Sequence, residues 1–363
     1  MLKKKIIFIL ALSLLLGGCT FPTPIPSAQP GTADPKTEPG TLNVLVHDSF
    51  AVSAELITAF EAANNAKINF IKGGDAGSTL NRAILASAAG SPEGDVLYGL
   101  DNTFLSRALE QDLLEPYNAP ALGQINAEFK LDPTNAALPI DYGDVCINYD
   151  VAYFEEKKLP LPENLTQLID PTYMGLLTVE NPATSSPGLA FMLTTIAEQG
   201  EDRWLEWWGA MKENGVVVAP DWETAYYTNF SGSSGQGAFP MVVSYASSPA
   251  AEVIYSDPKV TEAPTASLVF DNACWRQIEF AGILKGTPNG DLARKFIDFL
   301  LSADFQADVP MQMFVYPVLQ GVELPADFVQ FSQSPENPAT LSPALIAEKR
   351  DGWIKAWSDL MLD

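Results

Sequence analysis

The sequence predicts an α/β protein with two lobes, in which mainly parallel sheets carry helices on both faces and enclose a cleft. Short apolar strands alternate with helices along most of the chain, an order typical of parallel sheets covered by helices. About 320 residues follow the first 40, more than one hydrophobic core usually organises. Small ligands favour a cleft between two such lobes.

The elements follow from apolar spacing. Strands are expected at residues 42–46, 67–71, 95–98, 142–149, 176–179, 216–218, 241–245 and 277–284. Helices are expected at residues 53–63, 79–88, 101–113, 186–199, 292–301 and 344–360. Ser186 as N-cap and Pro187 at the first helical position favour the start of the helix that runs to Gln199. We expect an N-lobe of residues 41–143 and 270–314, and a C-lobe of residues 144–269 and 315–363.

The first 18 residues are typical of a secretory signal peptide. Lys3, Lys4 and Lys5 precede an apolar run at 6–16, which is too short to span ~30 Å of hydrocarbon. Gly17 and Gly18 lead into Cys19, so the pattern is that of a bacterial lipoprotein signal with Cys19 as the acylated first mature residue. An ordinary signal followed by an incidental cysteine is the alternative. The motif predicts a lipid anchor on the extracytoplasmic face of the cell membrane, in either type of envelope.

Residues 19–40 have the composition of a tether. Prolines occupy positions 22, 24, 26, 30, 35 and 39 without apolar periodicity, so we expect an extended segment. It would reach roughly 60 Å if it were polyproline-like throughout. No later stretch has ~18 consecutive apolar residues, so the sequence predicts no second membrane anchor.

The chain is strongly acidic. Removal of the three signal lysines leaves 18 basic against 45 acidic residues, a net charge of −27. This charge disfavours nucleic acid as a partner and favours cations in the long-range field, although an acidic surface kept for solubility explains it equally well.

After Cys19 only Cys146 and Cys274 remain, and they are either a disulfide or two buried thiols. Two cysteines and one histidine are too few for a structural zinc site of four cysteines, or of two cysteines and two histidines. We expect no cofactor.

Seven passages carry aromatic, acidic and serine residues at the turns of the predicted sheets. They are His47-Asp48-Ser49-Phe50, Asp75-Ala76-Gly77-Ser78-Thr79-Leu80-Asn81-Arg82, Gly99-Leu100-Asp101-Asn102, Thr184-Ser185-Ser186-Pro187-Gly188-Leu189, Asp221-Trp222-Glu223-Thr224-Ala225-Tyr226, Ser244-Tyr245-Ala246-Ser247-Ser248-Pro249 and Tyr316-Pro317-Val318. Together they resemble the thiamine-binding receptors of bacterial ABC importers, over nearly the whole chain from Leu42 to Leu360. The resemblance implies the two-lobed type II periplasmic-binding-protein fold with a cleft between the lobes. The resemblance implies a monomeric, non-enzymatic receptor that delivers thiamine, or its mono- or diphosphate, to a permease and its ATPase.

The resemblance also implies the ligand-contacting positions. They are Asp75, Ala76, Ser185, Ser186, Trp222, Tyr245, Ala246, Ser247, Ser248, Pro249, His47 and Phe314. Trp222 and Tyr245 offer aromatic faces to a thiazolium cation, and Asp75 offers a carboxylate. Trp222 is alternatively a packing anchor, and Asp75 a turn or cap residue.

Two pairs of serines would offer donors to the tail of the ligand. Ser185 and Ser186 open a helix whose N-terminal amides favour an anion, so a hydroxyl or phosphate is expected there, and plain capping is compatible with that role. Ser247 and Ser248 form a second such turn beside Tyr245.

Three positions depart from the pattern of the family. His47 and Ala251 stand where tyrosine is usual, and Phe314 stands where tryptophan is usual, so the affinity or the preferred form of the vitamin is expected to differ. His47 would introduce sensitivity to pH, or it is a satisfied structural residue.

A ferric-ion receptor of the same architecture is the alternative function, because Tyr226 and Tyr227 offer adjacent phenolate oxygens to a hard cation. Adjacent helical residues point about 100° apart, so one of the two rings is alternatively packed inward. A receptor for another small organic cation and a structural or adhesive lipoprotein are further alternatives. Enzymatic activity is disfavoured, since the chain has one histidine and lacks a G-x-S-x-G elbow, a P-loop and a dinucleotide-binding signature. The aromatic face formed by Trp204, Trp208 and Met211 is expected to be core packing.

Overall fold

The computed structural model describes residues 38–233 and 237–362. The predicted signal peptide and the lipidation site Cys19 lie outside the described residues, as does nearly all of the tether. Residues 39–363 form one unit by their internal packing. The division into an N-lobe and a C-lobe therefore stays a proposal.

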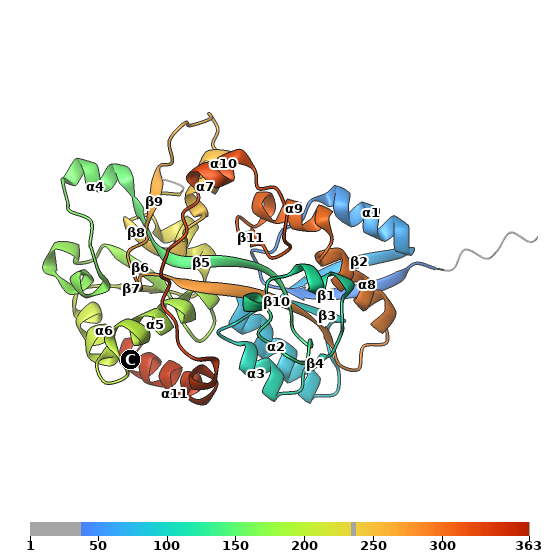
Figure 1. The fold of residues 1–363 in the computed structure, drawn as a ribbon. Coiled ribbons are helices and arrows are strands. Elements are labelled where there is room, and N and C mark those ends of the chain that lie inside the picture. Colours follow the sequence, from blue (N-terminus) through green and yellow to red (C-terminus); the bar gives the residue numbers. More distant parts are fainter. Residues whose placement is uncertain (1–37, 234–236, 363) are drawn as a thin grey trace, which may run out of the picture. The chain divides into compact units, whose positions relative to one another are not determined.

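Strands and helices alternate from the start of the described chain (Figure 1). The strands are β1 Gly40–Val46, β2 Ala66–Lys72, β3 Val96–Asp101, β4 Leu114–Glu115, β5 Leu138–Asp150, β6 Leu177–Glu180, β7 Val217–Ala219, β8 Met241–Tyr245, β9 Thr265–Leu268, β10 Trp275–Leu284 and β11 Tyr316–Pro317. The α-helices are α1 Ala54–Asn64, α2 Ala76–Ala88, α3 Leu105–Glu110, α4 Val151–Lys157, α5 Ser186–Gln199, α6 Trp204–Glu213, α7 Ser248–Ile254, α8 Gly290–Leu300, α9 Ala303–Gln312, α10 Ala326–Phe331 and α11 Pro343–Met361. Short 3-10 turns lie at Pro120–Gln124, Ala127–Phe129, Leu165–Ile169 and Pro171–Tyr173, and a π-helical turn lies at Thr224–Asn229.

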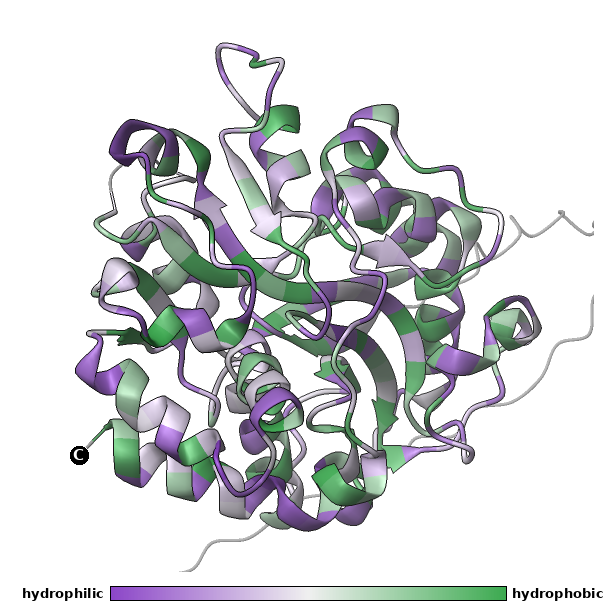
Figure 2. Ribbon diagram, turned by 60° about the vertical axis from the view of Figure 1, so that its left-hand side comes forward, coloured by the Kyte–Doolittle hydropathy of each residue, from purple (hydrophilic) through white to green (hydrophobic). Residues whose placement is uncertain are grey.

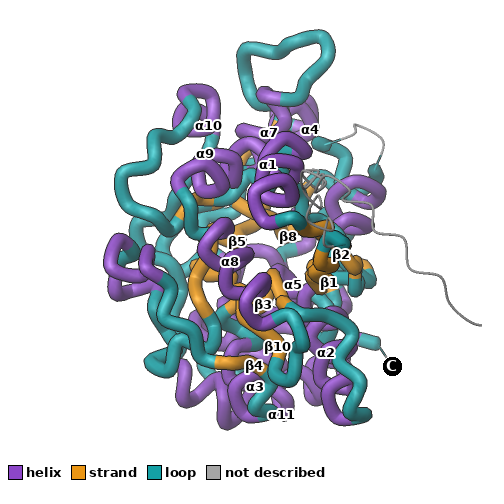
Figure 3. Tube along the Cα trace, turned by 90° about the vertical axis from the view of Figure 1, so that its right-hand side faces the viewer, coloured by secondary structure: helices purple, strands orange, loops and turns teal. Residues whose placement is uncertain are grey.

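The strands form a single mixed sheet with the order β2-β1-β3-β10-β5-β8-β6-β7. Pairing is parallel at both ends of this order, where β1 joins β2 and β3, and β6 joins β7 and β8. In the middle, the long strands β5 and β10 run antiparallel to each other and to their neighbours. Figure 3 shows these strands at the centre of the fold with helices around them. The α/β class is confirmed, and the two crossing strands make the sheet mixed rather than mainly parallel.

One expected helix is much shorter than predicted. A helix was expected from Asp101 to Leu113, but α3 spans only Leu105–Glu110, and Asp101 ends strand β3. The carboxylate of Asp101 accepts hydrogen bonds from the backbone N–H and the hydroxyl of Thr103, which favours a turn over a helical start. Asp112 has a φ of 52°, a left-handed conformation that ends the helical path.

The hydrophobic core follows the sheet, and in Figure 2 the central strands are mostly green while purple segments gather on outer helices and loops. Residues of β3, β5 and β10 are almost entirely buried, as are Leu42 and Val44–Val46 of β1. The expected packing role of the tryptophan cluster is confirmed, because Trp204, Trp208 and Met211 are buried in α6. Trp208 meets Trp357 of α11 edge-on, with ring centroids 5.3 Å apart, so these rings are structural.

Cys146 and Cys274 form a disulfide, which resolves the alternative left open by the sequence. The bond joins β5 to the residue directly before β10. Cys146 also pairs in register with Ser244 of β8, so the bond lies next to the strand that ends at Tyr245. It thereby fixes the two long strands beside the candidate site.

Candidate functional site

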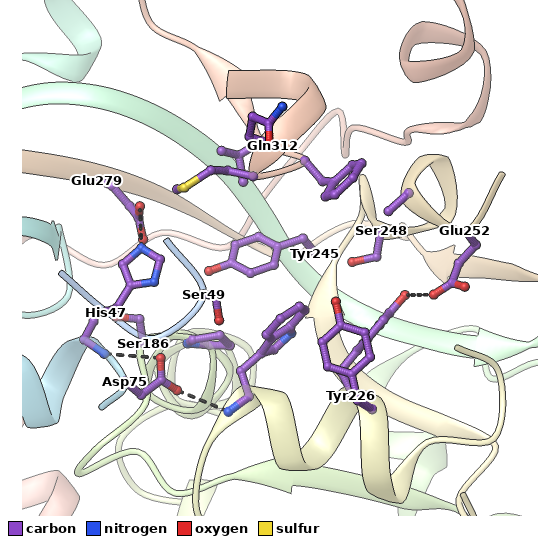
Figure 4. A pocket seen from close by; sticks show the side chains of 18 of the residues that line it. His47, Ser49, Asp75, Ser186, Tyr226, Tyr245, Ser248, Glu252, Glu279 and Gln312 are labelled. Atoms are coloured by element: carbon purple, nitrogen blue, oxygen red, sulfur yellow. Dashed lines mark hydrogen bonds and ion pairs between the residues drawn. The ribbon is translucent and has the colours of Figure 1, made fainter. Parts of the chain in front are cut away.

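A cavity of about 380 Å³ lies where the ends of several strands and helices converge (Figure 4). Eight of the predicted contact residues line it. They are His47, Asp75, Ala76, Ser186, Trp222, Tyr245, Ser248 and Phe314. These residues are up to 267 positions apart in the sequence, between His47 and Phe314, and they come from segments assigned to both predicted lobes.

Asp75 connects two distant parts of the chain at the cavity. It is the N-cap of α2, and its carboxylate accepts from the backbone N–H of Ala76 at 3.2 Å. Its second oxygen accepts from the backbone N–H of Trp222, also at 3.2 Å. Burial raises the pKa of Asp75, although these two N–H donors and the nearby His47 favour its charged form. Asp75 is thus both a helix cap and a carboxylate that faces the cavity.

Three aromatic rings form one side of the cavity. The indole of Trp222 stacks on Tyr226, with centroids 5.1 Å apart and planes 17° apart, and it donates from Nε1 to the Ser244 hydroxyl at 3.0 Å. Tyr245 lies edge-on to Trp222, with centroids 6.3 Å apart. The Tyr245 hydroxyl accepts from Gln277 at 2.8 Å. Because both indole and phenol are anchored by hydrogen bonds, their rings are held in fixed orientations at the cavity wall.

His47 follows strand β1 and is 8% exposed. Its Nε2 atom lies 3.6 Å from a carboxylate oxygen of Glu279 in β10. Burial lowers the pKa of His47, but Glu279 and the negative charges of Asp75 and Asp48 together outweigh it, so the net shift is upward. Gly99 makes room for the imidazole, since a Cβ atom there would lie only 2.3 Å from His47 Cδ2. His47 therefore lies at the wall beside an acidic partner, and its effect on the pH dependence of binding stays a prediction.

Two of the predicted serine donors are engaged within the protein. Ser186 donates to the carboxylate of Asp101, and the Ser248 hydroxyl lies 3.1 Å from that of Ser244. Ser185, rather than Ser186, is the N-cap of α5, and its side chain makes no capping hydrogen bond. The predicted serine cap at Ser186 is thus wrong by one position, because the Ser186 hydroxyl pairs with Asp101 instead.

Four predicted contact residues are not at the cavity wall, namely Ser185, Ala246, Ser247 and Pro249. All four are buried behind it. Ser247 has a supporting position, because its hydroxyl donates to the backbone carbonyl of Phe314. Phe314 has a φ of 56°, which is uncommon for a side chain of its size, and this bond helps to hold it there.

Tyr226 and Tyr227, the candidate iron ligands, and Ala251, the position where tyrosine is usual, also line the cavity. Sequence reasoning did not assign the remaining lining residues to the site, although some of them had a usable signal. They are Ser49, Pro187, Glu252, Tyr255, Glu279, Gln312, Met313 and Val315. Ala251, Glu252 and Tyr255 follow Ser248 at helical spacings of three, four and seven, so one face of α7 could have been predicted. Glu279 lines the cavity because it lies in the long central strand β10, and no sequence motif marks that position.

The charge of the cavity wall is predominantly negative. Asp75, Glu252 and Glu279 contribute carboxyl groups, and His47 is the only basic side chain among the described residues that line it. A second hollow of about 320 Å³ shares Asp75 and Trp222 with the cavity and adds three acidic side chains, Asp48, Asp221 and Glu223. The approach to the site therefore favours cations over anions.

Comparison with known proteins gives the family. The family of bacterial extracellular solute-binding proteins matches residues 91–337, and this chain belongs to it. The thiamine-binding periplasmic protein of Escherichia coli is 29% identical over 320 residues, which cover 87% of this chain and 92% of that protein. An iron uptake protein of Synechocystis is 26% identical over 321 residues, 86% of each chain. The solved structure of a periplasmic thiamin binding protein matches with a TM-score of 0.77 and 27% identity, over 89% of this chain and 96% of that one.

None of the helices in 38–233 and 237–362 is both long and apolar enough to cross a membrane. Within the same ranges, no group of three or more His, Cys, Asp or Glu side chains is arranged to hold a metal ion.

Proposed function

We propose that this protein is an extracytoplasmic receptor that binds thiamine and delivers it to an ABC transporter permease without chemical change. The observation that carries the proposal is the combination of Trp222 and Tyr245 with Asp75 in one cavity. Thiamine joins a flat aminopyrimidine to a positively charged thiazolium. Aromatic faces suit both rings, and a cation over an aromatic face gains ~0.5–2 kcal/mol depending on desolvation.

The charge of the wall supports the same ligand. The carboxylate of Asp75 can accept from the aminopyrimidine amine, while the rings of Trp222 and Tyr245 face the thiazolium. The relatives whose names include thiamine span 87% of this chain at 25–29% identity.

A thermal-shift titration tests the proposal. Ligand that binds only the folded state stabilises it by ~2.7 kcal/mol at one hundred times the dissociation constant, so thiamine should raise the melting temperature of the protein by several degrees. Choline, a cation without aromatic rings, is the control and should give a much smaller shift. No shift with thiamine would contradict the proposal.

A ferric-ion receptor is the second candidate, because Tyr226 and Tyr227 both line the cavity and one relative is named as an iron uptake protein. The Tyr226 hydroxyl donates to Glu252 at 2.8 Å, and its ring stacks on Trp222. Burial and the nearby Glu252 raise the pKa of Tyr226 well above its usual value, which disfavours the phenolate that iron requires. Visible absorbance on addition of ferric citrate would favour this candidate, and a colourless mixture would favour thiamine.

The cellular arrangement completes the proposal. Acylation at Cys19 would anchor the protein to the membrane, and the proline-rich residues 19–40 would serve as a tether to the permease. Residues 41–143 and 270–314 would close over the ligand against residues 144–269 and 315–363, by a hinge motion that the ligand favours. Metabolic labelling with a palmitate analogue tests the anchor, since label should be lost in Cys19→Ala.

A further inference from the structure

The N-terminus of α5 is the predicted site for an anionic tail, but acidic groups of the protein already surround it. Ser186 in its first turn donates to the carboxylate of Asp101, which is fully buried. Glu180 packs against the same turn, since a Cβ atom at Gly188 would lie 2.6 Å from the Glu180 carbonyl oxygen. Neither carboxyl oxygen of Glu180 has a hydrogen-bond partner in the described part of the chain.

These carboxyl groups lower the attraction of the helix end for a phosphate. Burial raises the pKa of Asp101 to about 6 and that of Glu180 well above its usual value. Asp75 adds a third carboxyl group close to Glu180, whose pKa it raises further. The burial that disfavours the charged forms of these acids would also disfavour a phosphate dianion here, and the Ser186 hydroxyl is already committed to Asp101, so the helix end is a poor site for it.

The opposite end of the cavity carries Glu252. Figure 4 shows Glu252 on the far side of the cavity from His47 and Asp75. Its side chain is held by Tyr226, whose hydroxyl donates to one carboxylate oxygen at 2.8 Å and whose ring stacks on Trp222. Glu252 is thus fixed by the same aromatic wall that would hold the ligand.

We propose that Glu252 is a specificity-determining residue that makes the site prefer unphosphorylated thiamine over its mono- and diphosphate. This inference rests on the proposed function, with the aminopyrimidine at Asp75 and the hydroxyethyl tail directed to Glu252. A hydroxyl donates a hydrogen bond to a carboxylate. An ionised phosphate has only acceptor oxygens and is negatively charged, so the carboxylate of Glu252 repels it. No lysine or arginine lines the described wall to offset that repulsion.

Isothermal titration calorimetry at pH 8 with thiamine, thiamine monophosphate and thiamine diphosphate tests the proposal. The unmodified protein should bind thiamine at least tenfold more tightly than either phosphate. Glu252→Gln keeps the size of the side chain and an acceptor for Tyr226, so the fold should persist. This variant should narrow the preference for thiamine at least threefold, through weaker thiamine binding and tighter phosphate binding. Glu262→Gln, the same change at an exposed position, should leave all three affinities unaltered.

The outcomes separate this inference from the proposed function. Equal affinity for the three forms, or an unchanged preference in Glu252→Gln, would overturn the role of Glu252 while leaving the thiamine receptor intact. Failure of every thiamine form to bind would overturn both. A structural role alone would weaken all three ligands in parallel and leave their ratio unchanged, which would also contradict the proposal.

Discussion

Replacement of Trp222 should reveal how much of the binding comes from its aromatic face. In the free protein the indole is half-buried, stacked on Tyr226 and bonded to Ser244. Trp222→Ala removes a cation–π contact worth ~0.5–2 kcal/mol and ring contacts worth ~0.5–1.5 kcal/mol. Together these predict that thiamine binds roughly 5- to 400-fold more weakly. Calorimetric titration of purified variants measures that loss directly.

Trp222→Phe separates the ring from its hydrogen bond. It keeps an aromatic face but removes the donor to Ser244, a bond worth about 0.5–1.5 kcal/mol, so the loss should stay below roughly tenfold. Ser244→Ala removes the other partner and should resemble Trp222→Phe. Melting temperatures without ligand show whether each variant is folded. Binding by Trp222→Ala within twofold of the unmodified protein would refute the reasoning, as would equal losses in the alanine and phenylalanine variants.

Three further changes have defined outcomes. Tyr245→Phe keeps the ring and loses only the bond from Gln277, so calorimetry should show a loss of less than about fivefold, against at least tenfold for Tyr245→Ala. Burial raises the pKa of Glu252 to about 7, so its negative charge is present above pH 7 and lost below it. Thiamine affinity should therefore fall about three- to tenfold from pH 8 to pH 6, and Glu252→Gln should flatten this dependence. Replacing Cys146 and Cys274 by alanine opens a loop with a sequence separation of 128. The loss of chain entropy on closing such a loop in the unfolded state corresponds to a stabilisation of up to about 5 kcal/mol. Urea unfolding should show a loss of about 2–5 kcal/mol, while a stability within 1 kcal/mol of the unmodified protein would contradict that estimate.

The fold was largely predictable because its strands and helices have strong local signals. The apolar runs at β1 and β8 and the Ser-Pro start of α5 were visible in the sequence with errors of one or two residues. The antiparallel centre was not visible, because it depends on the pairing of β5 with β10, which lie more than 120 residues apart. The start of α3 was mispredicted, since the turn formed by Asp101 competes with helix propensity.

The site was predictable where a motif lies at the end of an element. Asp75 at the cap of α2 and Tyr245 at the end of β8 both reach the cavity. Glu279 lies in the middle of β10, and it lines the cavity only because that long strand passes through the centre of the sheet. Ser247 shows the opposite error. It belongs to a motif that predicted a contact with the ligand, but its hydroxyl donates to the backbone carbonyl of Phe314. A motif therefore indicates which loop faces a ligand more reliably than which side chain does.

The negative charge of the chain should affect the binding of a cation in two ways, at long range from the whole surface and at short range from the cavity. Surface charge is screened over about 8 Å at physiological salt, so the net charge of −24 contributes mainly to the rate at which a cation approaches. The carboxyl groups of Asp75 and Glu252 are within the cavity and are screened less, so they act on affinity and selectivity. Salt should accordingly slow the association of thiamine while leaving its preference over the phosphates nearly constant. The two effects have separate origins because Asp75 and Glu252 line the cavity itself, whereas the other charges act from a distance.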